Sequence, residues 1–357
     1  MRRHLVVGLA VVAALAGSLG PTARASIVGP ASQPKQPKSG PGSNGGCTVA
    51  QTSFDNAAAP GNPVYVLQPN GSAPAAVAGG GCGDAKRPTV FIAHGLNSAD
   101  PTYYGDLIHH LVSVGNIVVF PTYQVNSGDK ADLEQAYRNV DAGIVQAVSK
   151  TGRIDTARVG WWGHSFGASM IPYLVRQGAA RGWGRQALWM TPVAMTFALL
   201  VGGGDIAVPA NTQELTVALE DDELADHRIG DEVFEAITLP ESHKRHATVN
   251  SDPHGQPAIV ADHFGPSGGN GTGGDAVDYI VWRYGDLLET CAVSGGRSCG
   301  DYSYTGTWSD GTPVVPATVT QHPVDEGPYP ALLAECDGLY GQQLNQARIH
   351  RCGATHI

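Results

Sequence analysis

Strand-like and helix-like runs of hydrophobic residues alternate along the chain from about residue 63 onward. Short, continuous apolar runs are typical of strands buried on both faces of a sheet, whereas longer runs with 3.6-residue periodicity are typical of helices. The runs that predict strands are 63–67, 88–94, 116–123, 158–162, 186–190, 215–220 and 245–250. The runs that predict helices are 103–115, 132–150, 169–177 and 276–291. Strands separated by helices of this length predict an α/β fold with a mainly parallel, doubly covered sheet.

The ends of the chain do not follow this pattern. Residues 1–25 have two early arginines, a short apolar run and the sequence ARA, which together predict a cleaved secretory signal peptide. Residues 26–46 are rich in Pro, Gly, Ser and Lys and predict a disordered linker. The α/β domain is then expected over 47–291, followed by a Cys-containing C-terminal extension over 292–357 with a short helix near 330–346. No other segment is apolar enough to cross a bilayer, so we expect no stable membrane anchor after cleavage.

The amino-acid composition indicates a globular protein and argues against nucleic acid as a partner. The chain has 357 residues, of which 42% are hydrophobic and 15% charged, enough for one large core. The formal net charge is -10, and the only basic cluster is a short HKRH stretch, so nucleic acid is not an expected partner.

Six cysteines remain after the predicted cleavage, an even number that is typical of an exported protein with disulfide bonds. No CxxC pair or tight Cys/His cluster is present, so a zinc site is not expected. Proximity along the chain predicts the pairs Cys47–Cys82, Cys291–Cys299 and Cys336–Cys352.

The stretch VGWWGHSFGASM, residues 159–170, contains the pattern G-x-S-x-G with Ser165 at its centre. A predicted strand precedes the pattern and a predicted helix follows it. In this context the serine lies on a tight strand-to-helix turn that exposes its hydroxyl and directs the first amides of the helix at the reacting centre. We attribute the two glycines to the backbone strain of that turn, and we predict that Ser165 is a nucleophile.

The predicted strand 88–94 ends in His94-Gly95-Leu96, at the position of the loop that supplies a second oxyanion donor. The amides of Leu96 and Phe166 are therefore the expected oxyanion hole. We interpret His94 as a residue that shapes this loop, because the chain order serine, acid, histidine requires a base downstream of the nucleophile.

The acid is expected just past the strand 215–220, in the sequence EDDELAD. A carboxylate there can bind the imidazole of the base and fix its tautomer. Asp222 is the first candidate because it lies three residues beyond Leu219. Asp221 and Asp226 are the alternatives.

Two histidines follow the last predicted strand and are candidates for the base. His254 lies nearer the end of that strand, and His263 lies nearer the closing helix. Position alone does not separate them.

Over residues 60–290 the chain resembles the α/β-hydrolase superfamily, and within it the secreted bacterial cutinases and PET hydrolases. WGHSFGA is similar to their WGHSMGG elbow, EDDELAD to their acid loop, and ADHFGPSGGN to their SHFxPN stretch. The resemblance implies that Asp222 is the acid and that His263 is the base, with His254 as the alternative.

The motifs together predict a secreted serine esterase that acts through an acyl-enzyme and needs no metal or cofactor. Only a small apolar flap over 191–214 is expected above the serine, which favours short-to-medium acyl esters or polymeric esters. The alternatives are a lipase, peptidase or acyltransferase on the same triad, or a non-catalytic binding protein. We expect a monomer.

Overall fold

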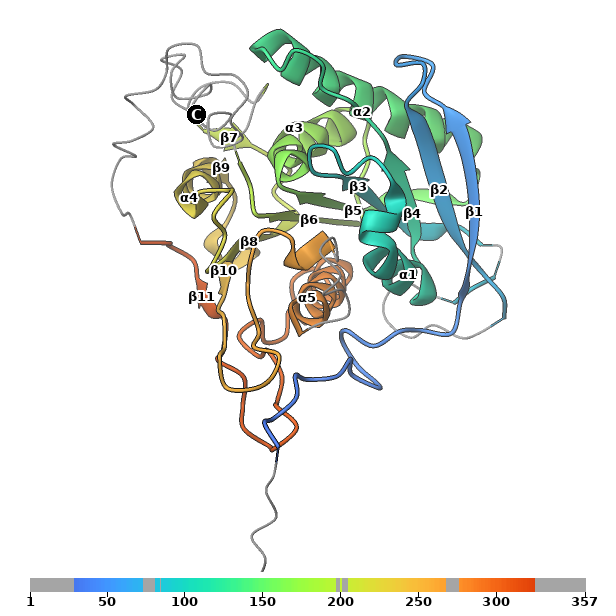
Figure 1. Ribbon diagram of the computed structural model, residues 1–357. Coiled ribbons are helices and arrows are strands. Elements are labelled where there is room, and N and C mark those ends of the chain that lie inside the picture. Colours follow the sequence, from blue (N-terminus) through green and yellow to red (C-terminus); the bar gives the residue numbers. More distant parts are fainter. Residues whose placement is uncertain are drawn as a thin grey trace, which may run out of the picture. The chain divides into compact units, whose positions relative to one another are not determined.

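The computed structural model describes residues 29–72, 81–83, 85–196, 200, 205–267 and 276–324. The chain forms two compact units, Met1–Pro30 and Ala31–Ile357. All the elements described below belong to the second unit (Figure 1).

A mostly parallel sheet of nine described strands runs through this unit, in the order β1-β2-β4-β3-β5-β6-β8-β10-β11. Neighbouring strands from β4 to β10 are parallel, while β1, β2 and β11 join at the two edges as antiparallel strands. The strands are β1 Thr48–Asp55, β2 Pro63–Asn70, β3 Arg87–Ala93, β4 Ile117–Pro121, β5 Ile154–His164, β6 Ala187–Val193, β8 Thr212–Leu219, β10 Lys244–Val249 and β11 Thr318–Thr320. A separate pair consists of β7 Ile206–Ala207 and β9 Ile237–Thr238.

Helices cover both faces of the sheet. The buried hydrophobic side chains form two clusters, one on each face of the sheet. One cluster contains residues of α1 and α5, and the other contains residues of α2, α3 and α4, so these two groups of helices lie on opposite sides of the sheet (Figure 1). Successive residues of a strand enter different clusters, as Phe91 and Ile92 of β3 do. The helices are α1 Gly105–Ser113, α2 Lys130–Lys150, α3 Phe166–Ala180, α4 His227–Ala236 and α5 Ala276–Val293, with short 3₁₀ turns η1 Pro101–Tyr104, η2 Glu241–His243 and η3 Gly265–Ser267.

The predicted α/β class and the mainly parallel, doubly covered sheet are confirmed. Each strand and helix predicted between residues 63 and 291 has a counterpart. α2 begins after Asp129 because that side chain accepts a hydrogen bond from Asp132 N, 2.9 Å away. The strands β1 and β11 and the helix α4 were not predicted. β1 is almost wholly exposed, so it carries no apolar signal.

The N-terminal segment 31–46 differs from the disordered linker predicted for 26–46. It forms no helix or strand, but Gly42 N donates to the buried Asp286 carboxylate at 2.7 Å. The side chain of Gln33 donates to Ala258 O at 2.8 Å. Backbone and amide hydrogen bonds connect these residues to the rest of the unit, and Ala31 is buried in its core.

The described part of the predicted C-terminal extension also belongs to the main unit. α5 continues to Val293, past the predicted boundary, and β11 pairs with β10 to become an edge of the central sheet (Figure 1). Trp308 is buried, and its Nε1 donates to Asp252 Oδ2 at 2.8 Å. The segment therefore completes the sheet and packs beside the loop that follows β10.

Two predicted disulfides, Cys47–Cys82 and Cys291–Cys299, are confirmed. The third predicted pair, Cys336–Cys352, lies outside the described residues, as do the predicted signal peptide and the helix near 330–346. Among the described helices, none combines the length and the apolar character that a membrane span requires.

Candidate active site

Ser165 occupies the one-residue turn between β5 and α3. Its backbone has φ 56° and ψ -125°, a region that non-glycine residues rarely adopt. Ser165 N donates to Val193 O on β6 at 3.0 Å, which ties the turn to the neighbouring strand. Between residues 159 and 172, Ser165 alone is not buried. The turn therefore presents this side chain at the carboxyl end of the parallel strands.

The two glycines of the pattern are needed for close approach of backbones rather than for an unusual φ. A Cβ on Gly167 would lie 2.0 Å from Ala93 O, and a Cβ on Gly163 would lie 2.5 Å from Gly167 O. Both distances are far below a van der Waals contact. The positive φ falls on Ser165 itself, so the sequence-based attribution of the strain to the glycines is corrected.

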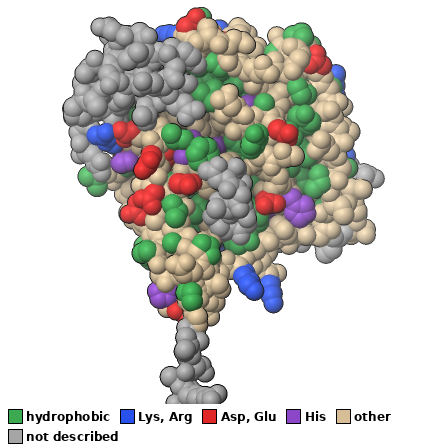
Figure 2. All heavy atoms as spheres, viewed as in Figure 1, with side chains coloured by type: hydrophobic (Ala, Val, Ile, Leu, Met, Phe, Trp, Pro, Cys, Tyr) green, Lys and Arg blue, Asp and Glu red, His purple; other side chains and the backbone are tan. Residues whose placement is uncertain are grey.

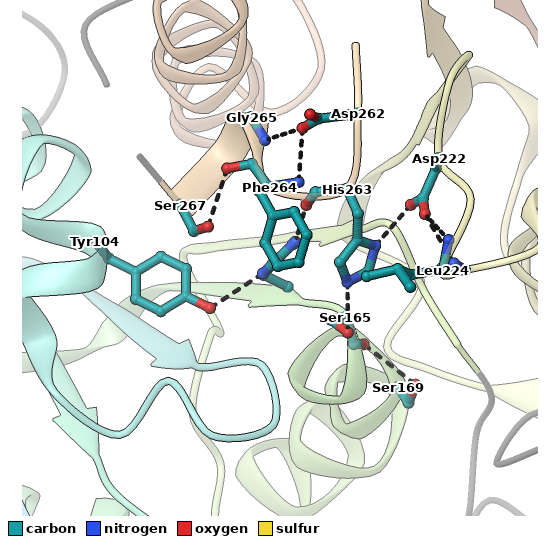
Figure 3. A network of polar contacts seen from close by, with 12 residues as sticks. Tyr104, Ser165, Ser169, Asp222, Leu224, Asp262, His263, Phe264, Gly265 and Ser267 are labelled. Atoms are coloured by element: carbon teal, nitrogen blue, oxygen red, sulfur yellow. Dashed lines mark hydrogen bonds and ion pairs between the residues drawn. The ribbon is translucent and has the colours of Figure 1, made fainter. Parts of the chain in front are cut away.

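His263 and Asp222 form a hydrogen-bonded chain with Ser165. His263 Nε2 lies 2.9 Å from Ser165 Oγ, and His263 Nδ1 lies 2.8 Å from Asp222 Oδ2 (Figure 3). The carboxylate can only accept, so Nδ1–H donates to Asp222 and the Nε2 lone pair accepts the Ser165 hydroxyl proton. The side chains of His263 and Asp222 are 7% and 3% exposed, so water screens this pair little.

In the loop that follows β8, the Asp222 carboxylate contacts His263, whereas the neighbouring carboxylates have other partners. Asp222 Oδ1 accepts the amides of Leu224 and Ala225, each at 2.8 Å, which fixes the carboxylate toward His263. Asp221 Oδ2 accepts the hydroxyl of Ser251 at 2.6 Å. Asp226 caps α4 and pairs with the following Arg228. Of the three predicted candidates, only Asp222 contacts a histidine beside Ser165.

The other candidate histidines have different partners. His254 Nε2 lies 2.8 Å from Asp310 Oδ2 on the exposed surface. Each ring nitrogen of buried His94 has a partner, Gly95 O for Nδ1 and Tyr123 N for Nε2, and the ring stacks on Tyr123. Burial lowers the pKa of His94 to about 4. His94 thus shapes the loop after β3, in the way the sequence predicted.

Leu96 follows Gly95 in the loop after β3 and lines the cleft above Ser165. None of the described residues accepts a hydrogen bond from the Leu96 amide. Phe166 is the first residue of α3, at the helix end where backbone amides and the helix dipole favour negative charge. Of the two residues predicted as oxyanion donors, Leu96 therefore lines the cleft with Ser165, and Phe166 follows Ser165 directly in the chain.

The cleft over Ser165 has a volume of about 460 Å³, its open mouth included. Leu224 and Phe264 flank the imidazole of His263 in Figure 3, and the Phe264 ring meets it edge-on at 5.5 Å. Hydroxyl groups of Ser98 and Thr196 also line the cleft. Of the predicted flap, 197–199 and 201–204 lie outside the described residues. The described walls combine an apolar rim with a few polar groups.

Two further residues of the site, His164 and Tyr104, were not found from the sequence. His164 Nε2 lies 2.7 Å from His263 O, and His164 Nδ1 lies 3.1 Å from the Tyr104 hydroxyl. His164 lies inside the G-x-S-x-G pattern, so its place beside Ser165 could be predicted from the sequence. Tyr104 lies 60 residues away from it, and no local signal connects the two.

Acidic side chains are unevenly distributed over the surface. On the face shown in Figure 2, acidic side chains gather near α4 and few basic side chains lie among them. In the described part of the chain, no group of three or more His, Cys, Asp or Glu side chains has the arrangement of a metal site. The chemistry available among the described residues is that of a serine, an imidazole and a carboxylate in hydrogen-bond contact.

A scan against protein-family models and a search of curated proteins found no match to this chain.

Proposed function

We propose that this protein is a serine carboxylic-ester hydrolase with Ser165 as nucleophile, His263 as general base and Asp222 as the supporting acid. One observation carries the proposal: a continuous hydrogen-bonded chain links Ser165 Oγ, the His263 imidazole and the Asp222 carboxylate. A hydroxyl is a weak nucleophile until an adjacent base removes its proton, and the imidazole is in position to do so.

The reaction proceeds in two acyl-transfer steps. His263 Nε2 takes the Ser165 proton as Oγ attacks the ester carbonyl, and the amides of Leu96 and Phe166 stabilise the oxyanion. The imidazolium then protonates the leaving alcohol, and a water activated by the same histidine releases the acid. Asp222 keeps Nδ1 protonated and stabilises the imidazolium without taking its proton.

The position of the site on the sheet supports an α/β-hydrolase fold. In open parallel sheets, ligands bind at the carboxyl ends of the strands, and the three side chains follow the ends of β5, β8 and β10 in the order serine, acid, histidine. The resemblance to secreted polyester hydrolases agrees with this arrangement. We place the protein outside the cell, since its predicted signal peptide and its disulfides fit export.

The cleft favours esters with short-to-medium acyl chains or exposed polymeric esters. Its apolar rim, Leu96, Leu224 and Phe264, suits the hydrocarbon part of an acyl chain.

The test compares purified Ser165→Ala, His263→Ala and His254→Ala variants with the native protein on p-nitrophenyl butyrate and on a long-chain triglyceride. We expect the native protein to hydrolyse the butyrate faster than the triglyceride. Ser165→Ala and His263→Ala should each lower kcat on the order of 10³-fold or more, because either loss breaks the unit that activates the nucleophile. His254→Ala, which removes only a surface pair, is the matched control and should keep native kcat. Full activity of His263→Ala would contradict the proposal.

A further inference from the structure

His164 lies beneath the proposed catalytic residues and joins two segments of the site. The ring is fully buried and lies 4.8 Å from the His263 ring, centroid to centroid. Its Nε2 contacts His263 O, and its Nδ1 contacts the Tyr104 hydroxyl. Tyr104 in turn accepts the amide proton of Gly95 at 2.8 Å. One chain of hydrogen bonds therefore runs from the loop of Gly95 and Leu96 to the main chain of His263.

The direction of every hydrogen bond in this chain is fixed. A carbonyl oxygen only accepts, so His164 Nε2 carries the proton and donates it to His263 O. The neutral ring then has a lone pair on Nδ1, which must accept from the Tyr104 hydroxyl. Hydrogen bonds that run in one direction polarise and strengthen one another in a buried environment.

The protonation states agree with this direction. Burial, and to a smaller extent the neighbouring His263, lowers the pKa of His164 to about 3, so the ring stays neutral while His263 carries the charge of the reaction. Burial raises the pKa of the Tyr104 hydroxyl, so its proton remains available for donation.

We propose that Tyr104 and His164 are positioning residues. They hold the loop of Gly95 and Leu96 and the backbone of His263 in fixed positions relative to Ser165. This inference rests on the proposed function. The packing leaves little room for adjustment, because a Cβ on Gly95 would lie 3.3 Å from both His164 Nδ1 and Ser165 Cβ. A catalytic group displaced by about 1 Å can lose about 100-fold in rate, so a tie between the two segments matters for turnover.

Tyr104→Phe tests the tie by removing one oxygen atom. We expect kcat on p-nitrophenyl butyrate to fall about 10- to 100-fold with KM within about twofold, because His263 and the loop of Gly95 and Leu96 lose their common partner while the apolar side chains of the cleft are kept. The control is Tyr302→Phe, which removes a buried hydroxyl that has no partner among the described residues. It should keep native kcat. A native kcat for Tyr104→Phe, or a change confined to KM, overturns the proposal.

A pair of variants at position 164 separates positioning from simple filling of space. His164→Phe keeps a ring but has no hydrogen-bonding groups, whereas His164→Gln keeps a donor near the place of Nε2. The Gln variant should recover at least about tenfold of the kcat that the Phe variant loses. Equal kcat values for the two variants, both measured on protein with a cooperative thermal transition, overturn the proposal.

Failure of the proposed function is recognised separately. If the native protein hydrolyses no ester, the rate at which a fluorophosphonate labels Ser165 replaces kcat for the same variants. The order native, Gln, Phe in labelling rate then supports the positioning role. Equal labelling rates, or no labelling of the native protein, overturn it.

Discussion

Ser165 holds a strained backbone conformation that its neighbours impose. A non-glycine residue in this region costs on the order of 1–3 kcal/mol, and such strain persists only where the surroundings fix it. The surroundings here are the hydrogen bond to Val193 O and the tight contact of Gly167 with the end of β3. The exposure of the Ser165 side chain thus depends on backbone packing beneath it.

Gly167→Ala is expected to destabilise the fold strongly. The new Cβ would meet Ala93 O at 2.0 Å, and backbone atoms cannot move aside as a side chain does. We expect the free energy of unfolding to fall by about 3 kcal/mol or more, measured by urea denaturation. The control is Gly285→Ala in α5, where a Cβ meets nothing within 4 Å and which should gain up to about 1 kcal/mol. Equal effects of the two changes would contradict this reading of Gly167.

Asp222→Asn tests the tautomer of the base. The amide keeps the size of the carboxylate but can present a donor to His263 Nδ1, which favours the wrong tautomer for accepting the Ser165 proton. We expect kcat to fall on the order of 10³- to 10⁴-fold with little change in stability. Asp226→Asn is the matched control, because asparagine also caps helices well and Asp226 contacts α4 rather than the site. A similar loss in both variants would count against Asp222 as the acid.

At the scale of elements, the surroundings of Ser165 come from one continuous stretch of sequence, whereas Asp222 and His263 come from distant loops. The strand, turn and helix around Ser165 are contiguous, so hydrophobic pattern and motif predicted them together. Which histidine, His254 or His263, lies beside Ser165 depends on how the fold brings distant loops together. The positions of the two residues along the chain did not decide between them. Asp221, an alternative acid in the sequence, instead connects the loop after β8 to the loop after β10. Its backbone N donates to Ala261 O at 2.9 Å, and its carboxylate accepts the Ser251 hydroxyl.

Trp308 connects the C-terminal segment to the loop that follows β10. Asp252 is buried, which alone would raise its pKa, but hydrogen bonds from Trp308 Nε1, Val315 N and His254 N outweigh burial and lower it. A lowered pKa means that the ionised Asp252 stabilises the fold above the ordinary carboxyl pKa of about 4. That contribution is lost as the pH falls through the lower pKa of the folded state.

Trp308→Phe removes the indole donor but keeps an aromatic ring. We expect the free energy of unfolding at pH 7 to fall by about 1–3 kcal/mol, and the difference from the native protein to shrink below about pH 4 as Asp252 becomes protonated. Urea denaturation at both pH values measures this. A destabilisation of the same size at both would show that packing, not the hydrogen bond to Asp252, accounts for it.

At the scale of the whole molecule, the sheet was predictable and its borders were not. Buried parallel strands are continuous apolar runs, which the sequence displays directly. Among the described strands, the exposed β1 pairs only with the neighbouring β2, whereas the short β11 and the segment 31–46 are held by hydrogen bonds to residues far along the chain. Composition reports whether a segment can bury apolar surface, so it misjudged segments that are fixed by polar contacts.

A buried carboxyl group in α5, that of Glu289, should make stability depend on pH. Burial raises the pKa of Glu289 to about 7, with a smaller contribution from Asp286 and against the hydrogen bond from Asn116. An unfolded Glu has a pKa of about 4.3, so between that pH and about 7 the folded state keeps a proton that the unfolded state loses. The free energy of unfolding therefore falls as the pH rises from about 4.3 to about 7.

Glu289→Gln removes this titration while keeping an acceptor for Asn116. We expect its free energy of unfolding to fall less between pH 5 and pH 8 than that of the native protein, since the amide never needs to ionise. The exposed Glu223→Gln is the control and should keep the native dependence on pH. A pH dependence unchanged in Glu289→Gln would contradict the assignment.

The central claim, that His263 activates Ser165, is tested most directly by fluorophosphonate labelling followed by mass spectrometry of the digested protein. We expect one adduct, on the peptide that contains Ser165, with labelling lost in His263→Ala and retained in His254→Ala. An adduct on another residue, or undiminished labelling of Ser165 in His263→Ala, would contradict it.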